Sequence, residues 1–443
     1  MDQTQPQRFL TEPYGAYRQA VVPPRDDRLV RVGPGTPGGE YLRRFWHPFL
    51  HADDLGELPL AVRLLGEDLV AFRDLGGRVG LLEKHCPHRG ASLEFGRVEE
   101  RGIRCCYHGW LFDTDGSILE APAEPDDNPY VGKQCQGAYP VREYRGLLFA
   151  YLGPPDCAPP FPRYDLTENP AFAVGLGQPA GWAANYQPTN WLQIMDNTVD
   201  QAHEAFLHAR HSGAQFLDQN RRPIEELALI GELDWWETPI GIACHETRRL
   251  DDSIWVRSME WIVPNCVIVC RPPVLPPAYP EGEDEVHYPP FLIRWKVPID
   301  DAETMNLSLI CYYPGEDQDY VTKPAPAARA LYGERDDETR RRYPGDYDAQ
   351  VGQGPIANHG IEHLGATDRG VAMMRRMVRE GIEAVEAGED PYGLMREGRV
   401  IPTYSREMML KVPAAPDPAA DMELQHAVSR QVFERSLAAA AGR

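Results

Sequence analysis

The chain has 443 residues, with 67 acidic and 45 basic side chains and a formal net charge of −22. This length predicts two or three domains with a sizeable core. Such an acidic chain lacks the basic surface that binding to nucleic acid or an anionic membrane requires, so we expect neither partner. No apolar run reaches the ~18 residues of a membrane span, and Met1–Leu10 lacks the apolar stretch of a secretion signal. We therefore expect a cytoplasmic protein whose nine cysteines are reduced thiols, free to act as ligands.

The first part of the chain is rich in short β-type runs separated by glycine turns. They predict strands at Leu60–Leu65, Leu69–Phe72, Val79–Leu82, Gly102–Cys105 and Gly146–Leu152. Five prolines between Pro154 and Pro162 form a stiff extended linker, which we interpret as a domain boundary. The expected organisation is an N-terminal segment over 1–42 that packs on the larger domain, a small antiparallel β domain over 43–155, and the larger domain over 156–443.

Beyond the linker, a strand at Phe172–Leu176 and a helix over Asn190–His211 precede a second β-rich block. Its strands are predicted at Gly241–Arg249, Ile254–Val263, Val267–Arg271, Phe291–Val297 and Leu307–Tyr313. Because no helix intervenes, we expect an antiparallel sheet, interrupted by a long loop at Pro272–Pro290 with seven prolines. The chain ends in helices at Val371–Glu386 and Asp421–Ala441. The fold class is therefore α+β.

Two short Cys/His motifs lie in the small β domain. Cys86-Pro87-His88 is followed, after 16 residues, by Cys105-Cys106-Tyr107-His108. Two such turns could bring four ligands to one metal centre. A structural zinc site also uses short ligand spacings, but zinc fingers place their two histidines together on a helix. Here each loop supplies one thiolate and one imidazole, which suits a [2Fe–2S] cluster with two thiolates on one iron and two imidazoles on the other.

These loops, Cys86 to Leu93 and Cys105 to Trp110, resemble the cluster-binding loops of Rieske proteins, specifically the Rieske domain of ring-hydroxylating oxygenases. The resemblance implies that Cys86, His88, Cys105 and His108 hold a [2Fe–2S] cluster. It also implies a larger catalytic domain of the helix-grip, START-like type. Cys106 stands one position out of register for a ligand, and we expect it to be a buried packing thiol.

A second candidate site lies in the predicted helix Asn190–His211. His203 and His208 are five residues apart, so on a regular helix at ~100° per residue they diverge by ~140°. Either one of them is an ordinary histidine, or the helix distorts or ends between them so that both can reach one metal. His211 falls outside the spacing, and we expect it on the surface.

The string from Asn197 to His208 resembles the mononuclear iron motif of Rieske oxygenases, in which two histidines and a later aspartate bind ferrous iron. The resemblance implies that His203 and His208 are ligands. It also implies that the Asp200 carboxylate bridges His203 to a Rieske histidine, here His108, of a neighbouring subunit. The alternative for Asp200 is a local contact that orients His203. Asn197, one turn earlier, is a further residue near the iron.

The third ligand follows from resemblance to the phthalate-dioxygenase branch, where an aspartate precedes a Gly-Pro-Ile sequence by eight residues. Asp346 stands at that offset from Gly354, whereas Asp348 would need a two-residue deletion. Asp368 is a further alternative, but a capping role at the helix that starts at Arg369 explains it. We expect His359 and His363 to be structural.

The resemblance implies a terminal oxygenase that uses O₂ and electrons from NAD(P)H. The electrons would arrive through a separate flavin/iron–sulfur reductase, with or without a ferredoxin, since the chain has no Gly-x-Gly-x-x-Gly nucleotide site after a predicted strand. Such enzymes are homotrimers, sometimes stacked into hexamers. The implied reaction is hydroxylation or O-demethylation of an aromatic, carboxylated substrate. Arg257, Arg294 and Lys296 could pair with its carboxylate, although an ordinary surface salt bridge would also explain each of them.

Three other functions stay open from the sequence. Two belong to the same class, a ring cis-dihydroxylating dioxygenase and an N-demethylase of a quaternary ammonium compound. The third is a non-catalytic Rieske electron carrier, which would need neither the second large domain nor the Asp200, His203 and His208 motif.

Overall fold

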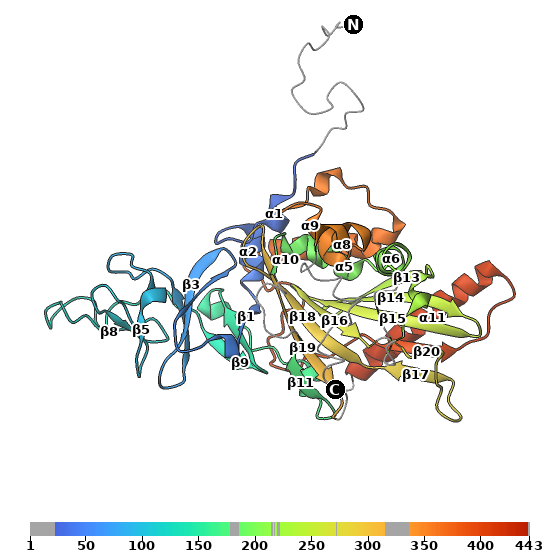
Figure 1. Cartoon of the computed structure of the whole chain (residues 1–443), viewed down its shortest axis with the longest axis horizontal. Coiled ribbons are helices and arrows are strands. Elements are labelled where there is room, and N and C mark those ends of the chain that lie inside the picture. The colour runs from blue at the N-terminus through green and yellow to red at the C-terminus, as the bar shows by residue number, and fades with distance from the viewer. Residues whose placement is uncertain are drawn as a thin grey trace, which may run out of the picture.

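The computed structural model describes residues 23–177, 186–213, 216, 218, 222–271, 273–314 and 336–441. A smaller β-rich part lies at one end of the molecule, beside a larger part built on one long antiparallel sheet (Figure 1). The predicted α+β class is confirmed. Among the helices that the structure describes, none combines the length and apolarity needed to cross a bilayer.

The smaller part consists of three small antiparallel sheets. Their strands are β1 (Trp46–His51), β10 (Leu147–Tyr151) and β9 (Val141–Tyr144); β2 (Leu60–Leu64), β3 (Glu67–Arg73) and β4 (Val79–Glu83); and β5 (Arg97–Val98), β6 (Ile103–Arg104), β7 (Leu111–Phe112) and β8 (Ile118–Glu120). Every strand that the sequence predicts in this part is present within two or three residues of its expected ends.

The large sheet runs in the order β11-β19-β18-β16-β15-β14-β13, with β12 paired to β19 and β20 to both β15 and β17. Its strands are β11 (Ala173–Leu176), β12 (Tyr186–Gln187), β13 (Glu232–Thr238), β14 (Gly241–Leu250), β15 (Ser253–Ile262), β16 (Cys266–Cys270), β17 (Glu285–Tyr288), β18 (Pro290–Pro298), β19 (Thr304–Tyr312) and β20 (Glu407–Lys411). The segment expected to be a loop at Pro272–Pro290 contains β17, a correction to that prediction; residue 272 lies outside the described residues.

Helices cover both faces of this sheet. The described helices of the chain are α1 (Asp27–Val30), α2 (Pro37–Leu42), α3 (Asp165–Glu168), α5 (Trp191–Val199), α6 (Ala202–Ala205), α8 (Asp337–Arg342), α9 (Asp346–Val351), α10 (Arg369–Glu386) and α11 (Pro418–Ala441). Because side chains alternate along a strand, Trp235 and Trp236 face opposite sides. The Trp235 indole donates to the carbonyl of Val199 in α5 at 2.8 Å, whereas Trp236 stacks on Phe433 of α11.

The smaller part packs on the α11 side of the sheet, near β18. Phe149 of β10 meets Trp295 of β18 with ring centroids 5.4 Å apart, and both belong to one continuous hydrophobic core. The described residues of the predicted N-terminal segment contact the larger part instead: Asn190 donates to the carbonyl of Val30, and Arg28 pairs with Glu386 of α10. The histidines of the second motif lie on the opposite side of the sheet, the side covered by α5 and α6.

Candidate metal centres

The two Cys/His loops of the smaller part have the same backbone closure. The N–H of Cys86 donates to the carbonyl of Ala91 at 2.8 Å, and the N–H of Cys105 donates to that of Trp110 at 2.8 Å. In each loop the residue four positions after the cysteine donates back to it, and it is a glycine with φ of 75° (Gly90) or 76° (Gly109). This left-handed conformation favours glycine, so both loops tighten around their cysteine in the same way.

The four predicted cluster ligands converge at the tips of these loops. The rings of His88 and His108 have centroids 4.4 Å apart, and His88 stacks on Trp110 with an interplanar angle of 3°. The His88 Nδ1 atom is buried and has no hydrogen-bond partner among the residues that the structure describes. An unpaired buried acceptor costs free energy, and a metal bond from this nitrogen would remove that cost. The residues present therefore fit the cluster.

Burial sets the electrostatics of these ligands. Burial and the neighbouring Cys105 thiol raise the pKa of Cys86 to about 11, so this thiol stays protonated until a metal favours the thiolate. Partial burial, with His88 and Arg89 nearby, lowers the pKa of His108. The lowered pKa favours the neutral form of the His108 imidazole, as binding through a lone pair requires.

Cys106 does not behave as expected. Its side chain is exposed, whereas the sequence predicted a buried packing thiol. The tight turn that buries Cys105 directs the next side chains outward, and Tyr107 is also 56% exposed.

The second motif does not form one helix, which corrects the prediction for Asn190–His211. Helix α5 ends at Val199, Asp200 is extended with φ −98° and ψ 107°, and α6 contains only Ala202–Ala205. A π-helical turn then spans Phe206–His211. A π turn closes its hydrogen-bonded ring over five residues instead of four. This distortion allows His203 and His208, which are five residues apart, to face one metal.

His203, His208 and Asp346 lie together. The Asp346 Oδ1 atom is 3.1 Å from the Nε2 of His208 and 3.5 Å from the Nε2 of His203. One ligand atom from each residue lies within 4.8 Å of the others. Two imidazoles and one carboxylate suit a ferrous centre with open positions. The donor set therefore fits the predicted mononuclear iron.

Hydrogen bonds orient two of these ligands. The His203 Nδ1 atom lies 2.6 Å from the carbonyl oxygen of Asp200, so Nδ1 donates to this carbonyl, and Nε2, which faces Asp346, is the nitrogen left for a metal. The Asn197 amide donates to Asp346 Oδ1 at 3.3 Å. Burial opposes the charge on His203, but Asp346 outweighs it and raises the pKa of His203 to about 9. In the protein alone a proton thus balances the buried carboxylate, and a divalent cation would replace it.

The structure brings Asp346, rather than its two alternatives, to the histidines. Asp348 accepts from the N–H of Gly345 at 3.0 Å and from the Arg340 guanidinium at 2.6 Å. Asp368 stands at the N-terminal cap of α10, yet its carboxylate accepts from the N–H of Gly365 and makes no capping bond to the helix. Asp368 therefore stands at the predicted cap position of α10, but the predicted capping bond is not made.

Asp200 contacts His203 mainly through its backbone. Its carboxylate is 3.7 Å from the His203 Nδ1 atom, farther than its carbonyl oxygen, and one oxygen accepts from the N–H of Ala202 at 3.0 Å. Burial raises the pKa of this carboxyl group. Its side chain is 27% exposed, so part of the carboxylate stays accessible from outside the chain.

A neighbouring cluster of Asp196, His359 and Glu362 also brings possible metal ligands together. The sequence did not single out its central residue, Arg375 of α10. Arg375 donates to Asp196 at 2.6 Å and 3.0 Å and to Glu362 at 3.0 Å, so its guanidinium occupies the centre. This cluster is an ion pair that ties α10 to α5. His363 is exposed, and His211 is exposed as predicted.

The three basic residues considered for substrate binding differ in their surroundings. Arg257 is buried and forms an ion pair with Glu204, which corrects the expectation of a surface salt bridge. Arg294 donates to the Ser308 hydroxyl at 3.2 Å. In the described part of the chain, the Lys296 ammonium has neither a hydrogen-bond nor an ion-pair partner. Burial and the adjacent Arg294 lower its pKa to about 7, while Asp346 acts in the opposite direction.

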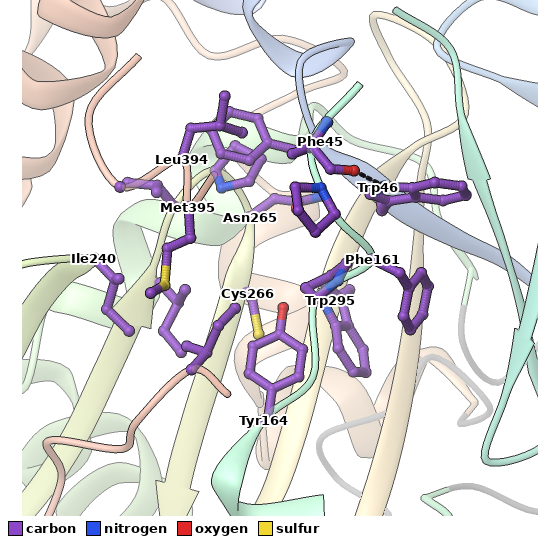
Figure 2. Close-up of a pocket in the computed structure, with 18 of the residues that line it drawn as sticks. Phe45, Trp46, Phe161, Tyr164, Ile240, Asn265, Cys266, Trp295, Leu394 and Met395 are labelled. Atoms are coloured by element: carbon purple, nitrogen blue, oxygen red, sulfur yellow. Dashed lines mark hydrogen bonds between the residues drawn. The ribbon is translucent and has the colours of Figure 1, made fainter. Parts of the chain in front are cut away.

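Figure 2 shows a pocket that is separate from both candidate metal sites. It measures about 620 Å³ including its open mouth, and its walls are mainly apolar. Phe45, Phe161, Tyr164, Trp295 and Met395 are among its lining residues. None of the predicted ligands lines it. Trp295 faces away from Arg294 and Lys296 on the same strand, so this pocket and the histidine site are on opposite faces.

Comparison with known proteins agrees with this arrangement. Residues 45–144 match the model of the Rieske [2Fe-2S] domain. The oxygenase subunit of tert-butanol monooxygenase / tert-amyl alcohol desaturase from Aquincola tertiaricarbonis is 39% identical, over 93% of this chain and 88% of that protein. The phenoxybenzoate dioxygenase subunit alpha of Ectopseudomonas oleovorans is 36% identical, over 86% and 90%. A solved structure of Pseudomonas putida CBB5 NdmA, a QL mutant with caffeine, shares the fold with a TM-score of 0.59 at 22% identity, covering 81% of this chain and 96% of that one.

Proposed function

The chain belongs to the Rieske non-haem iron oxygenases, and we propose that it is a terminal oxygenase that hydroxylates or O-demethylates a carboxylated aromatic compound. The convergence of His203 Nε2, His208 Nε2 and Asp346 Oδ1 carries this proposal. It supplies the two imidazoles and the carboxylate of a ferrous oxygenase site. A Rieske electron carrier has no need of such a site, which removes the non-catalytic alternative.

The protein would hold two inorganic groups. Cys86 and Cys105 would bind one iron of a [2Fe–2S] cluster, and His88 and His108 the other. His203, His208 and Asp346 would bind the mononuclear Fe(II). When bound, the cluster supplies single electrons and the Fe(II) centre reacts with O₂.

The residues of the chain set the conditions for this chemistry. The Asp200 carbonyl fixes the proton of His203 on Nδ1, and the Asn197 amide holds the Asp346 oxygen in place. His208 and Asp346 are buried or half-buried. Burial limits the entry of water and strengthens each electrostatic contact at the site.

Electron transfer would cross a subunit interface. In Figure 1 the tip of the smaller part, with β5 and β8, lies far along the molecule from α5 and α6. The accessible Asp200 carboxylate would bridge His203 to the partner subunit's His108. We therefore propose a homotrimer, or a stacked hexamer, that receives electrons from a separate reductase in the cytoplasm, where NAD(P)H is available.

Lys296 and Arg294 support a carboxylated substrate. Alternation along β18 puts both on the face opposite Trp295, the same face as the histidine site. On the adjacent strand, Asn306 donates to Gln187, and Gln187 donates to Gln350 of α9, one turn after Asp346. A half-buried ammonium with no anionic partner is costly. A substrate carboxylate would supply that partner.

A second candidate is hydroxylation of an uncharged alcohol. It is favoured by the 39% identity to the tert-butanol monooxygenase subunit, whose substrate has no carboxylate. The phenoxybenzoate and phthalate enzymes, at 36% and 32% identity, favour the acid instead. The charge on Lys296 distinguishes the two candidates, because only an anion benefits from it.

Turnover with a substrate panel tests the proposal. The purified protein, with a reductase and NADH, would be given methoxylated, phenolic and dicarboxylated aromatics and a tertiary alcohol. Products would be followed by mass, by formaldehyde release for demethylation, and by dihydrodiol formation for dihydroxylation. We expect a hydroxylated or demethylated aromatic acid. A protein that contains zinc and no iron would refute the proposal.

A further inference from the structure

The short helix α6 must be held in place by contacts from outside itself. It contains four residues between the extended Asp200 and the π turn. Helices this short are not stable alone, because the free energy of nucleating a helix exceeds the stabilisation that one hydrogen-bonded turn provides. Its first cap, Gln201, makes no side-chain capping bond. The rotation of α6 about its axis, and with it the direction of His203, therefore depends on tertiary contacts.

The strongest such contact comes from Glu204, the residue directly after His203. Its carboxylate accepts two bonds from Arg257 of β15, from Nε at 2.5 Å and from Nη2 at 2.8 Å. Both side chains are buried, at 4% and 7% exposed. A two-point bond between a planar guanidinium and a carboxylate fixes direction as well as distance.

Arg257 is itself held from the other side. Its Nη1 atom is 3.5 Å from Glu407 of β20, and Glu407 accepts from the Trp255 indole at 2.7 Å. The guanidinium therefore cannot follow α6 if the helix rotates. Although burial acts against the charge, Arg257 keeps the pKa of Glu204 well below its usual range, so the carboxylate stays ionised.

We propose that Glu204, through its two bonds to Arg257, is a positioning residue for the mononuclear iron: it fixes the rotation of α6 and so the angle at which His203 meets the metal. Successive residues on a helix point ~100° apart. With Glu204 fixed to the sheet, His203 points toward Asp346, and the Asp200 carbonyl then sets the rotation of its ring. This inference rests on the proposed function, because it needs a metal at His203, His208 and Asp346.

The test compares E204Q and E204D with the unchanged protein. Protein depleted of mononuclear iron would be titrated with Fe(II), and the nitric oxide adduct of the iron would be examined by EPR. We expect E204Q to bind Fe(II) about 10- to 100-fold more weakly, with an altered adduct spectrum. The [2Fe–2S] absorption should be unchanged, since those ligands lie in the other part of the chain. E204D keeps the charge and should recover part of the affinity.

D421N is the matched control. Asp421 of α11 accepts from Arg249 of β14 at 2.6 Å and 3.1 Å, a two-point pair on the α11 face of the sheet whose side chains are 14% and 18% exposed. We expect this variant to lose thermal stability without a change in iron affinity or in the adduct spectrum. This separates a general loss of stability from a change at the metal.

The inference is wrong if E204Q keeps the iron affinity and adduct spectrum of the unchanged protein, whatever happens to its melting temperature. If E204Q does not fold, the same two measurements on E204D decide: a shifted spectrum supports positioning, and an unchanged affinity and spectrum overturn it. If the unchanged protein itself binds no iron beyond its cluster, the proposed function fails, which is a different result.

Discussion

Asp346 and His208 approach to 3.1 Å between Oδ1 and Nε2, although 138 residues separate them in the chain. His203 reaches the same oxygen from α6, and Asn197 reaches it from α5. Asp346 is the first residue of α9, so its carboxylate extends from a helix start toward two imidazoles. Side chains from α5, α6 and the π turn therefore meet at one carboxylate oxygen of α9.

Replacing Asp346 should remove the mononuclear iron alone. D346N takes away one of three ligands, so we expect iron beyond the cluster to fall by about tenfold or more while the brown colour remains. D348N is the control, since Asp348 bonds Gly345 and Arg340 instead. It should lose only about 1 kcal/mol of stability. Iron analysis and visible absorption check both variants. A D348N protein without the third iron would mean that the wrong aspartate has been chosen.

Replacing Asp200 should separate metal binding from electron transfer. D200N keeps the backbone carbonyl that holds His203, so both metal groups should stay bound. Without the carboxylate, the proposed bridge to a partner subunit could not form, and turnover should fall by about 100-fold or more. Rapid mixing of the reduced protein with O₂ and substrate would show a cluster that stays reduced. Normal reoxidation in D200N would exclude the bridging role.

Lys296 should govern affinity for an acid and not for its neutral analogue. K296M removes the charge from the face of the sheet that carries the histidine site, so we expect the KM of a carboxylated substrate to rise by about 10- to 100-fold. The KM of the corresponding methyl ester or amide should stay within about twofold. K411M is the control, because Lys411 of β20 is half exposed and pairs with Asp284. Equal effects of K296M on the acid and the ester would contradict anion recognition.

The same lysine predicts a pH dependence. Its pKa is lowered from 10.5 to about 7, so the charged form is lost as the pH rises above that value. The ratio kcat/KM reports ionisations of the free enzyme. For a carboxylated substrate it should therefore decline between pH 7 and 9, and this decline should be absent in K296M. A pH profile that is identical in both proteins would show that another group titrates.

Glu260 should make stability fall as the pH rises. It is fully buried in β15, and one oxygen accepts from the N–H groups of Tyr404 and Ser405. Burial raises its pKa from 4.5 to about 8. Between these values the folded chain holds a proton that the unfolded chain releases, so its contribution is full below pH 4.5 and lost as the pH passes 8. The slope is at most about 1.4 kcal/mol per pH unit.

E260Q resembles the protonated side chain and cannot titrate. Compared with the unchanged protein, its free energy of unfolding should depend less on pH between 6 and 9, with the larger gain at pH 9. Urea unfolding at several pH values measures this. E237Q serves as the control, since Glu237 is exposed on β13. Parallel pH curves for E260Q and the unchanged protein would count against the raised pKa.

Local patterns in the sequence were sufficient to predict most strands and the two Cys/His loops. Alternation and glycine turns report on short-range geometry, and the loop motifs carry their ligands within a few residues. The break at Asp200 and the π turn were not predicted, because apolar periodicity is the same for a continuous helix. The sequence indicated only that His203 and His208 can bind one metal if the helix distorts or ends between them.

Side-chain positions that depend on residues far away in the sequence were harder to predict. Asp346 and Asp348 lie two residues apart on one helix turn, so composition treats them alike. The family offset to Gly354 favoured Asp346, and the packing of α9 against α5 brings this residue to the histidines. Arg257 was expected on the surface because its partner Glu204 is 53 residues away. Cys106 was expected to be a buried packing thiol because it stands one position out of register for a ligand, but its side chain is exposed. Each of these depends on where a side chain points in the folded chain.

The direction from which α6 is held has an evolutionary consequence. Arg257 holds α6 from β15, whereas Arg294 and Lys296 lie on β18, on the same face of the sheet. Mutations on β18 and β19 can therefore accumulate without changing the orientation of the histidine side chains toward the metal. A lineage built this way can exchange one substrate for another while inheriting its metal centre intact. Relatives named for molecules as unlike as tert-butanol and phthalate are the outcome that such separate inheritance predicts.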